Sequence, residues 1–342
     1  MNFDTLLKQL QDWTNKVPLI ILGSGASVPF GIPSMLELGA YLKNTLSFDN
    51  DIDNAQLESF KKVLDKNNDL EKTLLEIQLN NDILKSVIKA TWKLITEADL
   101  KAYEQFVLKG KEIPLVVLLK HLLSTTDKKL SIVTTNYDRI AEYSASIAKA
   151  FICTGYAQNY VGHFSDSIHT NALSKIEGYT GQVNIWKVHG SLDWFETPTK
   201  ENIYLPLRSS IPQDYKPLIV TPGLSKYAET HNEPYRTIFA QADNEIKNAN
   251  GFLCIGYGFN DVHVQPKLIQ QIETKPIIVI TKELTPKTKE AIIGSKCKNY
   301  ILMEKNGDSH TKIYSSSQGE DTIKNESYWR LAEYIKLITA KE

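Results

Sequence analysis

Glycines and small polar residues directly follow the first apolar run of the chain, Pro18 to Leu22. This segment consists of Gly23, Ser24, Gly25, Ala26 and Ser27. Glycine lets the backbone turn tightly and approach a ligand, and amides at the start of a following helix attract the charge of a pyrophosphate. Val28 stands where the usual dinucleotide motif has its third glycine, so the segment alone predicts a nucleotide-binding turn only weakly.

A second turn, Gly31-Ile32-Pro33-Ser34, follows closely. Glycine and proline fix the path of such a loop, and we place Ile32 and Pro33 among the cofactor-binding candidates. Ser34 and Glu37 have the spacing of a capping box, which predicts that a helix begins here. Capping alone accounts for these two residues.

Polar residues also close the apolar run Leu130 to Val133. They are Thr134, Thr135, Asn136, Tyr137 and Asp138. Open α/β sheets bind ligands at the carboxyl ends of their strands, so Thr135, Asn136 and Asp138 are candidates for a site. The alternative is that Asn136 or Asp138 only caps the next helix.

His189 ends the run Val183 to Val188 and precedes Gly190. An imidazole at such a strand end can exchange protons near neutral pH within the same crevice. The other histidines have helical or loop contexts, and no pair of them has a convincing metal-ligand spacing. We therefore predict no metal.

A further glycine-containing segment follows the run Gly251 to Ile255 and is a second candidate for contacts with phosphate or ribose. Its residues are Gly256, Tyr257, Gly258, Phe259, Asn260 and Asp261, with His263 just beyond. Thr281 ends the run Pro276 to Ile280 and could bond to an adenosine ribose, or could simply be a strand-end threonine.

Elements that alternate between buried strands and helices must position these residues. Strands are expected at the five runs above and at Pro217 to Val220, and helices at Arg139 to Ala150, Pro234 to Asn248, Thr285 to Ile293 and Glu326 to Ala340. This pattern predicts a doubly wound, mainly parallel Rossmann-like α/β sheet. The stretch from Asn54 to Leu123 has helical spacing throughout and is expected to be a helical insertion within a single domain, residues 1–342. Residues Gly155 to Gly181 are expected to form an exposed loop near the site.

Composition excludes several classes of protein. The 39 basic and 40 acidic residues nearly cancel, which argues against nucleic acid or an anionic membrane as the main partner. No stretch approaches the roughly 20 apolar residues of a spanning helix, so a cytoplasmic protein is expected. The cysteines Cys153, Cys254 and Cys297 form no CxxC pair, which argues against a disulfide framework or a structural zinc site.

Taken in order, Gly-Ser-Gly-Ala-Ser with Gly-Ile-Pro, Thr-Thr-Asn-Tyr-Asp, His-Gly-Ser and Gly-Tyr-Gly-Phe-Asn-Asp resemble the motifs of sirtuins. The closest resemblance is to the bacterial branch of NAD-consuming anti-phage enzymes. It implies a sirtuin-like fold with NAD as substrate. The phosphates would lie on Gly23, Gly25, Ala26 and Ser27, Asn136 and Asp138 would face the nicotinamide ribose, His189 would be the catalytic base, and Gly256, Tyr257 and Asn260 would contact phosphate or ribose.

Two departures from the deacetylating sirtuins favour simple hydrolysis of NAD. Ser34, Met35 and Leu36 stand where those enzymes have Asp-Phe-Arg, and three cysteines cannot build their four-cysteine zinc module. The resemblance therefore implies an NAD glycohydrolase, an effector that depletes NAD, with a HerA-type ATPase as a possible partner and a homo-oligomeric state. The alternatives are a catalytically silent sensor of NAD or ADP-ribose, and a protein deacylase or ADP-ribosyltransferase. The helical insertion could bind a partner or cover the NAD crevice.

Overall fold

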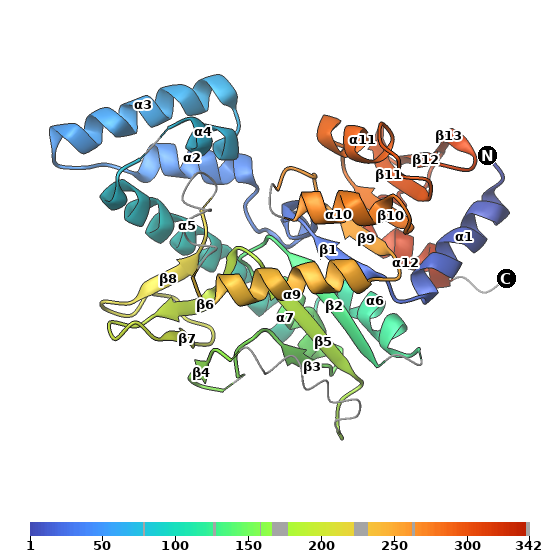
Figure 1. Cartoon of the computed structure of the whole chain (residues 1–342), viewed down its shortest axis with the longest axis horizontal. Coiled ribbons are helices and arrows are strands. Elements are labelled where there is room, and N and C mark those ends of the chain that lie inside the picture. The colour runs from blue at the N-terminus through green and yellow to red at the C-terminus, as the bar shows by residue number, and fades with distance from the viewer. Residues whose placement is uncertain are drawn as a thin grey trace.

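A nine-stranded sheet forms the centre of the computed structural model, which describes residues 1–77, 79–125, 128–157, 159–165, 177–221, 232–261 and 264–339. The strand order is β13-β12-β11-β10-β9-β1-β2-β5-β3 (Figure 1). Neighbours from β11 to β3 pair in parallel. These strands are β1 (Leu19–Leu22), β2 (Lys129–Thr134), β3 (Phe151–Cys153), β5 (Gln182–Lys187), β9 (Phe252–Ile255), β10 (Ile277–Thr281) and β11 (Tyr300–Asn306). The predicted mainly parallel α/β class is confirmed.

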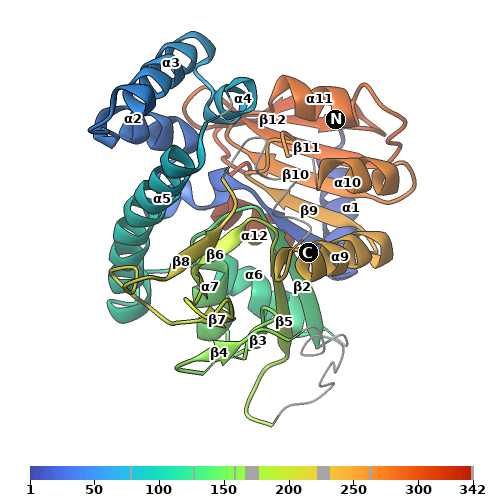
Figure 2. The same ribbon diagram turned by 60° about the vertical axis from the view of Figure 1, so that its left-hand side comes forward.

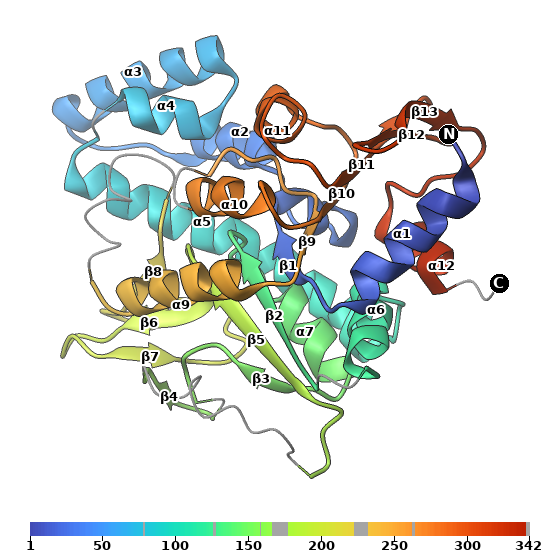
Figure 3. The ribbon, with the colours of Figure 1, turned by 45° about the vertical axis from the view of Figure 1, so that its right-hand side comes forward.

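Helices cover both faces of this sheet, which explains why its central strands β1 and β9 consist of apolar residues only. In β1, Ile20 and Leu22 face one buried core, whereas Leu19 and Ile21 face the other. The first core also contains residues of α1 (Phe3–Asn15), α6 (Pro114–Leu123), α7 (Ile140–Ile147) and α12 (Leu331–Thr339). The second contains residues of α9 (Tyr235–Asn248), α10 (Gln265–Ile272) and α11 (Pro286–Ile292). Figure 3 shows α1 beside α12, and the two helices are in contact.

The strand order reverses between β1 and β9. From β1 the chain moves to β2, β3 and β5 on one side, and it later returns to β9, β10 and β11 on the other (Figure 2). In open α/β sheets, ligands bind at the carboxyl ends of the strands beside such a reversal.

A second, antiparallel sheet has the order β4-β7-β6-β8. Its strands are β4 (Gly162–His163), β6 (Gly190–Glu196), β7 (Asn202–Tyr204) and β8 (Lys216–Ile219). The expectation that Pro217 to Val220 belongs to the parallel sheet is wrong, because this run lies in β8. A short apolar run has the same pattern in either kind of buried strand. The antiparallel strands β12 (His310–Ser315) and β13 (Gly319–Ile323) were not predicted.

Most of the predicted helices are present with shifted ends. The last helix begins at Leu331 rather than Glu326 and packs against α1 and α6. Ser34 and Glu37 form both hydrogen bonds of the predicted capping box. No helix in the described ranges is both long and apolar enough to cross a membrane. Part of the loop expected at Gly155 to Gly181 lies outside the described residues, as does His263.

Residues between β1 and β2 are mainly helical, and some of them form a lobe with its own buried core. This lobe contains α2 (Met35–Thr45), α3 (Asp51–Asn67), α4 (Leu70–Glu76) and α5 (Asn81–Ala102), the last followed by a π-helical turn, Tyr103–Leu108. Figure 1 shows α2, α3 and α4 grouped at one end of the molecule. The C-terminal half of α5 packs into the first of the two sheet cores through Trp92 and Ile95. The division into one domain and an insertion at residues 54–123 stays a prediction.

Candidate active site

A cavity of about 410 Å³ lies at the carboxyl ends of β1, β2, β5, β9 and β10. This volume is in the range of small-molecule sites. Every residue of the predicted site except Ala26 lines it: Gly23, Ser24, Gly25, Ser27, Ile32, Pro33, Thr135, Asn136, Asp138, His189, Gly256, Tyr257, Gly258, Asn260 and Thr281. Ala26 packs against the main core instead. The fold thus brings segments from five strand ends into one place.

The two glycine loops interlock at the point where the strand order reverses. The Gly25 amide donates to the Gly256 carbonyl over 3.1 Å, and the Gly23 amide donates to the Ile255 carbonyl over the same distance. A Cβ on Gly23 would lie 2.4 Å from the Gly256 oxygen, and Gly256 has a φ of +58°. Glycine is therefore required here for close approach of two backbones, which is independent of any ligand.

The amides of the first loop are engaged within the protein. Besides Gly23 and Gly25, the Ala26 amide donates to the Gly23 carbonyl and the Ser27 amide donates to the Ser24 carbonyl, both over 3.0 Å. The segment is a 3₁₀ turn, Ser24–Ala26, rather than the first turn of a long helix. The predicted phosphate contact of these residues stays a prediction.

Replacing Gly23 with alanine is expected to destabilise the protein by about 1–3 kcal/mol or more, because the added methyl group collides with the rigid backbone of the second loop. Chemical denaturation would measure the change in the free energy of unfolding. Gly39→Ala in α2 is the matched control, since its nearest contact would be an ordinary 3.5 Å to Leu64 and alanine favours a helix. Equal stability of Gly23→Ala and wild type would contradict the interlocked arrangement.

Asn136 connects the second segment to the first loop. Its amide nitrogen donates to the Gly23 carbonyl over 2.9 Å and to the Ser27 hydroxyl over 3.0 Å. Its backbone amide donates to Thr134 Oγ1, whose hydroxyl donates to the Leu22 carbonyl. These bonds do not cap the next helix. They fix the side chain at the crevice and use its donor hydrogens, which leaves the amide oxygen as the group available to a bound molecule.

Asp138 is a buried carboxylate in the same cavity. Burial raises its pKa from 3.8 to about 6, although the nearby charge of Lys187 and a hydrogen bond from Ser27 act in the opposite direction. Its Oδ1 accepts the Ile140 amide in the first turn of α7, whereas the N-cap residue of this helix is Arg139. A capping carboxylate alone has no need of such a buried position, and perturbed pKa values are common at functional sites.

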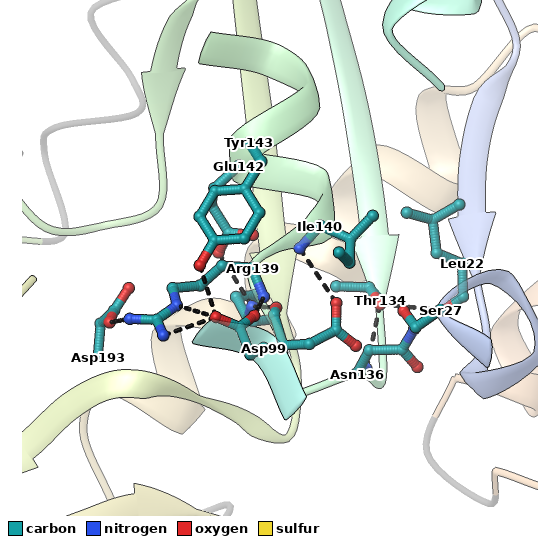
Figure 4. Close-up of polar contacts among 12 residues, drawn as sticks. Leu22, Ser27, Asp99, Thr134, Asn136, Arg139, Ile140, Glu142, Tyr143 and Asp193 are labelled. Carbon is teal, nitrogen blue, oxygen red and sulfur yellow. Dashed lines mark hydrogen bonds and ion pairs between the residues drawn. The ribbon is translucent and has the colours of Figure 1, made fainter. Parts of the chain in front are cut away.

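Buried charged residues next to this segment form a network of polar contacts (Figure 4). Asp99 of α5 accepts hydrogen bonds from Arg139 N and Nε, each 2.8 Å long, and from the Tyr143 hydroxyl at 2.5 Å. Arg139 Nη1 donates to Asp193 of β6 over 2.6 Å. The network joins α5 of the helical lobe, α7 and the antiparallel sheet through Arg139, which directly follows Asp138 in the chain. Sequence reasoning missed it, because its members are far apart along the chain.

Removing Asp99 should destabilise the protein strongly, because Arg139 would keep a buried charge without its main partner. We expect Asp99→Ala to lower the free energy of unfolding by about 3–5 kcal/mol. Urea denaturation would measure it, with Glu58→Ala as a control that removes an exposed ion pair with Lys61 in the same lobe. A loss no larger than that of the control would show that the network does not stabilise the fold.

His189 lies at the junction of the two sheets. It separates β5 from β6, and its carbonyl accepts the Val220 amide over 2.8 Å. Gly190 follows with a φ of +84°, and a Cβ there would lie 1.9 Å from the Leu218 oxygen, so glycine is required for the turn. The imidazole is buried, and its Nε2 lies 2.8 Å from Oδ2 of Asp261, which also lines the cavity.

Further residues complete the wall beyond the predicted set. They are Met35, Leu38, Glu71, Ile95, Tyr137, Asp261, Lys282, Glu283 and Thr285. Tyr137 and Asp261 belong to segments that the sequence had singled out, although neither was named as a site residue. Lys282, Glu283 and Thr285 directly follow Thr281, so proximity to that strand end is a signal that could have found them. Leu38, Glu71 and Ile95 come from the helical lobe, and no sequence signal indicated that they would line the cavity.

Metal ligands do not cluster in the part of the chain that the structure describes, where no group of three or more His, Cys, Asp or Glu residues could hold an ion. All three cysteines are free and buried. Cys254 lies in β9 and is fully buried.

The middle of the chain matches a known protein family. Residues 130–277 match the model of a family described as SIR2-like domain. This stretch of the chain is therefore similar to a SIR2-like domain. The matched range begins in β2 and ends in β10, so it includes Asn136, Asp138, His189 and Gly256. The first glycine loop and Pro33 lie outside the matched range but line the same cavity.

Solved structures of Sir2 proteins are also similar to this chain. A Sir2 homologue in complex with NAD has 14% sequence identity and a TM-score of 0.43, with 88% of each chain covered. A histidine-to-asparagine mutant of a Sir2 homologue with ADP-ribose has 16% identity and a TM-score of 0.45, covering 83% of this chain and 87% of that one. No curated protein matches this chain.

Proposed function

We propose that this protein hydrolyses NAD to nicotinamide and ADP-ribose. The observation that carries the proposal is the convergence of Asn136, Asp138 and His189 in one cavity, within a SIR2-like domain and at the reversal point of a parallel sheet. Such reversal points are where open α/β sheets bind nucleotides. The two glycine loops would lie along the phosphates, and Thr281 would contact the adenosine ribose.

Cleavage breaks the bond between C1 of the ribose and the nicotinamide nitrogen, which takes the electron pair and leaves as neutral nicotinamide. Positive charge then develops on the ribose. The buried carboxylate of Asp138 is ionised above about pH 6 and would stabilise this charge electrostatically, or would orient the leaving carboxamide. The free amide oxygen of Asn136 would hold a ribose hydroxyl or the attacking water.

A water molecule completes the reaction by forming the new bond to C1. His189 would accept the proton that this water or a ribose hydroxyl gives up. Burial of the imidazole at the cavity wall supports this role, because a base that is shielded from bulk solvent exchanges protons with the bound molecule. The products are nicotinamide, ADP-ribose and one proton.

Depletion of NAD would make this protein the effector of an anti-phage defence system. This part of the proposal rests on the sequence resemblance, as do a homo-oligomeric state and a HerA-type ATPase as partner. Such an activity requires restraint in the cell, so we expect turnover to depend on assembly. NAD consumption with and without the ATPase, together with light scattering to measure the mass of the assembly, would test both.

Identification of the reaction products distinguishes hydrolysis of NAD from deacylation. The purified protein would receive NAD with and without an acetylated lysine peptide, and the products would be identified by mass spectrometry. Hydrolysis predicts ADP-ribose and an unchanged peptide in both reactions. O-acetyl-ADP-ribose with a deacetylated peptide would replace the proposal with deacylation, and an ADP-ribosylated peptide would replace it with transfer.

A further inference from the structure

Asp261 and His189 form a buried acid–imidazole pair at the cavity wall. Asp261 follows β9 and His189 follows β5, and their relative exposures are 5% and 8%. Asp261 Oδ2 lies 2.8 Å from His189 Nε2, off the direction of the ring N–H. Isolated buried carboxylates are costly, so a carboxylate held this close to an imidazole is expected to interact with it.

The backbone holds the Asp261 carboxylate in place independently of the histidine. Its Oδ1 accepts the Val264 amide over 2.9 Å, and its carbonyl accepts the Gln265 amide over 3.1 Å at the start of α10. One carboxylate oxygen therefore accepts a hydrogen bond at the start of α10, while the other lies beside the imidazole. A group fixed in this way can select the orientation and tautomer of a ring beside it.

We infer that Asp261 is a positioning residue for His189: it keeps the proton of the neutral imidazole on Nε2 and so leaves Nδ1 as the atom that accepts a proton during NAD cleavage. This inference rests on the proposed function only for its catalytic consequence. The described residues provide no hydrogen bond to Nδ1, so that nitrogen is free to act on a bound molecule. Asp261 also stabilises the imidazolium that forms after proton transfer.

The variant Asp261→Asn separates positioning from helix capping. Asparagine retains an oxygen that can accept the Val264 amide, so α10 keeps its cap, but the negative charge beside Nε2 is lost. The amide nitrogen can also face the ring, which favours the opposite tautomer. Asp69→Asn is the matched control, because Asp69 caps α4 in the same manner, accepting the Lys72 amide over 3.0 Å, and does not line the cavity.

Two measurements on the full-length protein test the inference. In the first, kcat and KM for NAD are determined for wild type, Asp261→Asn and Asp69→Asn. We expect kcat of Asp261→Asn to fall by about 10²- to 10⁴-fold with KM changed only a few-fold, and no change in the control. An unaltered kcat in Asp261→Asn, when wild type cleaves NAD, would overturn the inference.

The second measurement does not need activity. Nitrogen NMR of protein labelled with ¹⁵N-histidine reports the tautomer of each ring, and the His189 signal is assigned by its disappearance in His189→Gln. We expect the Nε2–H tautomer in wild type and its loss in Asp261→Asn. If wild type failed to cleave NAD, the proposed hydrolase function would be wrong. The NMR result would still test whether Asp261 sets the tautomer of His189. The same tautomer in both proteins would refute the pairing itself.

Discussion

Replacing His189 with alanine is expected to lower kcat for NAD cleavage by about 10²- to 10⁴-fold, because the variant loses the group that accepts a proton in the cavity. Initial rates of nicotinamide release would measure the effect. The backbone contacts of this residue persist, since its carbonyl still accepts the Val220 amide. Circular dichroism should therefore show a folded protein, and NAD should still bind.

Two further variants make the His189 result interpretable. His189→Gln keeps a polar side chain of similar size beside Asp261 but supplies no base, so it should be as inactive as the alanine variant. His163→Ala removes an exposed histidine on β4 and should retain wild-type activity. Near-wild-type rates in folded His189→Ala and His189→Gln would remove this residue from the chemistry.

Replacing Asp138 with asparagine is expected to raise stability at neutral pH and to abolish activity. Burial raises the Asp138 pKa from 3.8 to about 6 in the folded protein, so folding favours its protonated form. Below pH 3.8 the carboxyl is protonated in both the folded and the unfolded state and does not lower the free energy of unfolding. Between about pH 3.8 and 6 the unfolded chain ionises while the folded protein retains its proton, so the free energy of unfolding falls. Above pH 6 the carboxyl is ionised in both states, and the free energy of unfolding stays lower by about 3 kcal/mol.

Asparagine cannot ionise, and its oxygen can still accept the Ile140 amide. The gain of Asp138→Asn over wild type should therefore appear between pH 4 and 6 and stay constant above pH 6, as measured by urea denaturation across this range. Asp12→Asn on the exposed surface of α1 should show no such pH dependence. A lower stability of Asp138→Asn at pH 7 would mean that Lys187 compensates the buried charge fully. Loss of activity together with increased stability is the pattern expected of a residue retained for function.

The strand-end residues could be predicted because the topology of a parallel sheet gathers them. Once the apolar runs before Gly23, Asn136, His189 and Gly256 are recognised as neighbouring parallel strands, their carboxyl ends must share one edge. Neither the order of the strands nor any distance between side chains was needed for that step. The convergence of these four positions therefore follows once their runs are assigned to one parallel sheet.

Pairings across long sequence distances could not be predicted. Nothing local indicates that Arg139 at the start of α7 meets Asp99 of α5, or that Asp261 meets His189, because each residue alone fits a solvated or capping role. Likewise, the apolar run of β8 is indistinguishable from a parallel strand until its partner β6 is known. The Gly23–Gly256 contact could not be predicted either, because a glycine in the sequence does not indicate which backbone segment packs against it.

Chromatographic analysis of NAD incubated with the purified protein, alone and with a HerA-type ATPase, tests the central claim most directly. The cavity centred on Asn136, Asp138 and His189 predicts equal amounts of nicotinamide and ADP-ribose from wild type. It predicts that both products form at least about 100-fold more slowly with the His189→Ala variant. NAD that remains intact in every assembly, although calorimetry shows it bound, would contradict the claim and identify the cavity as a sensor of the nucleotide.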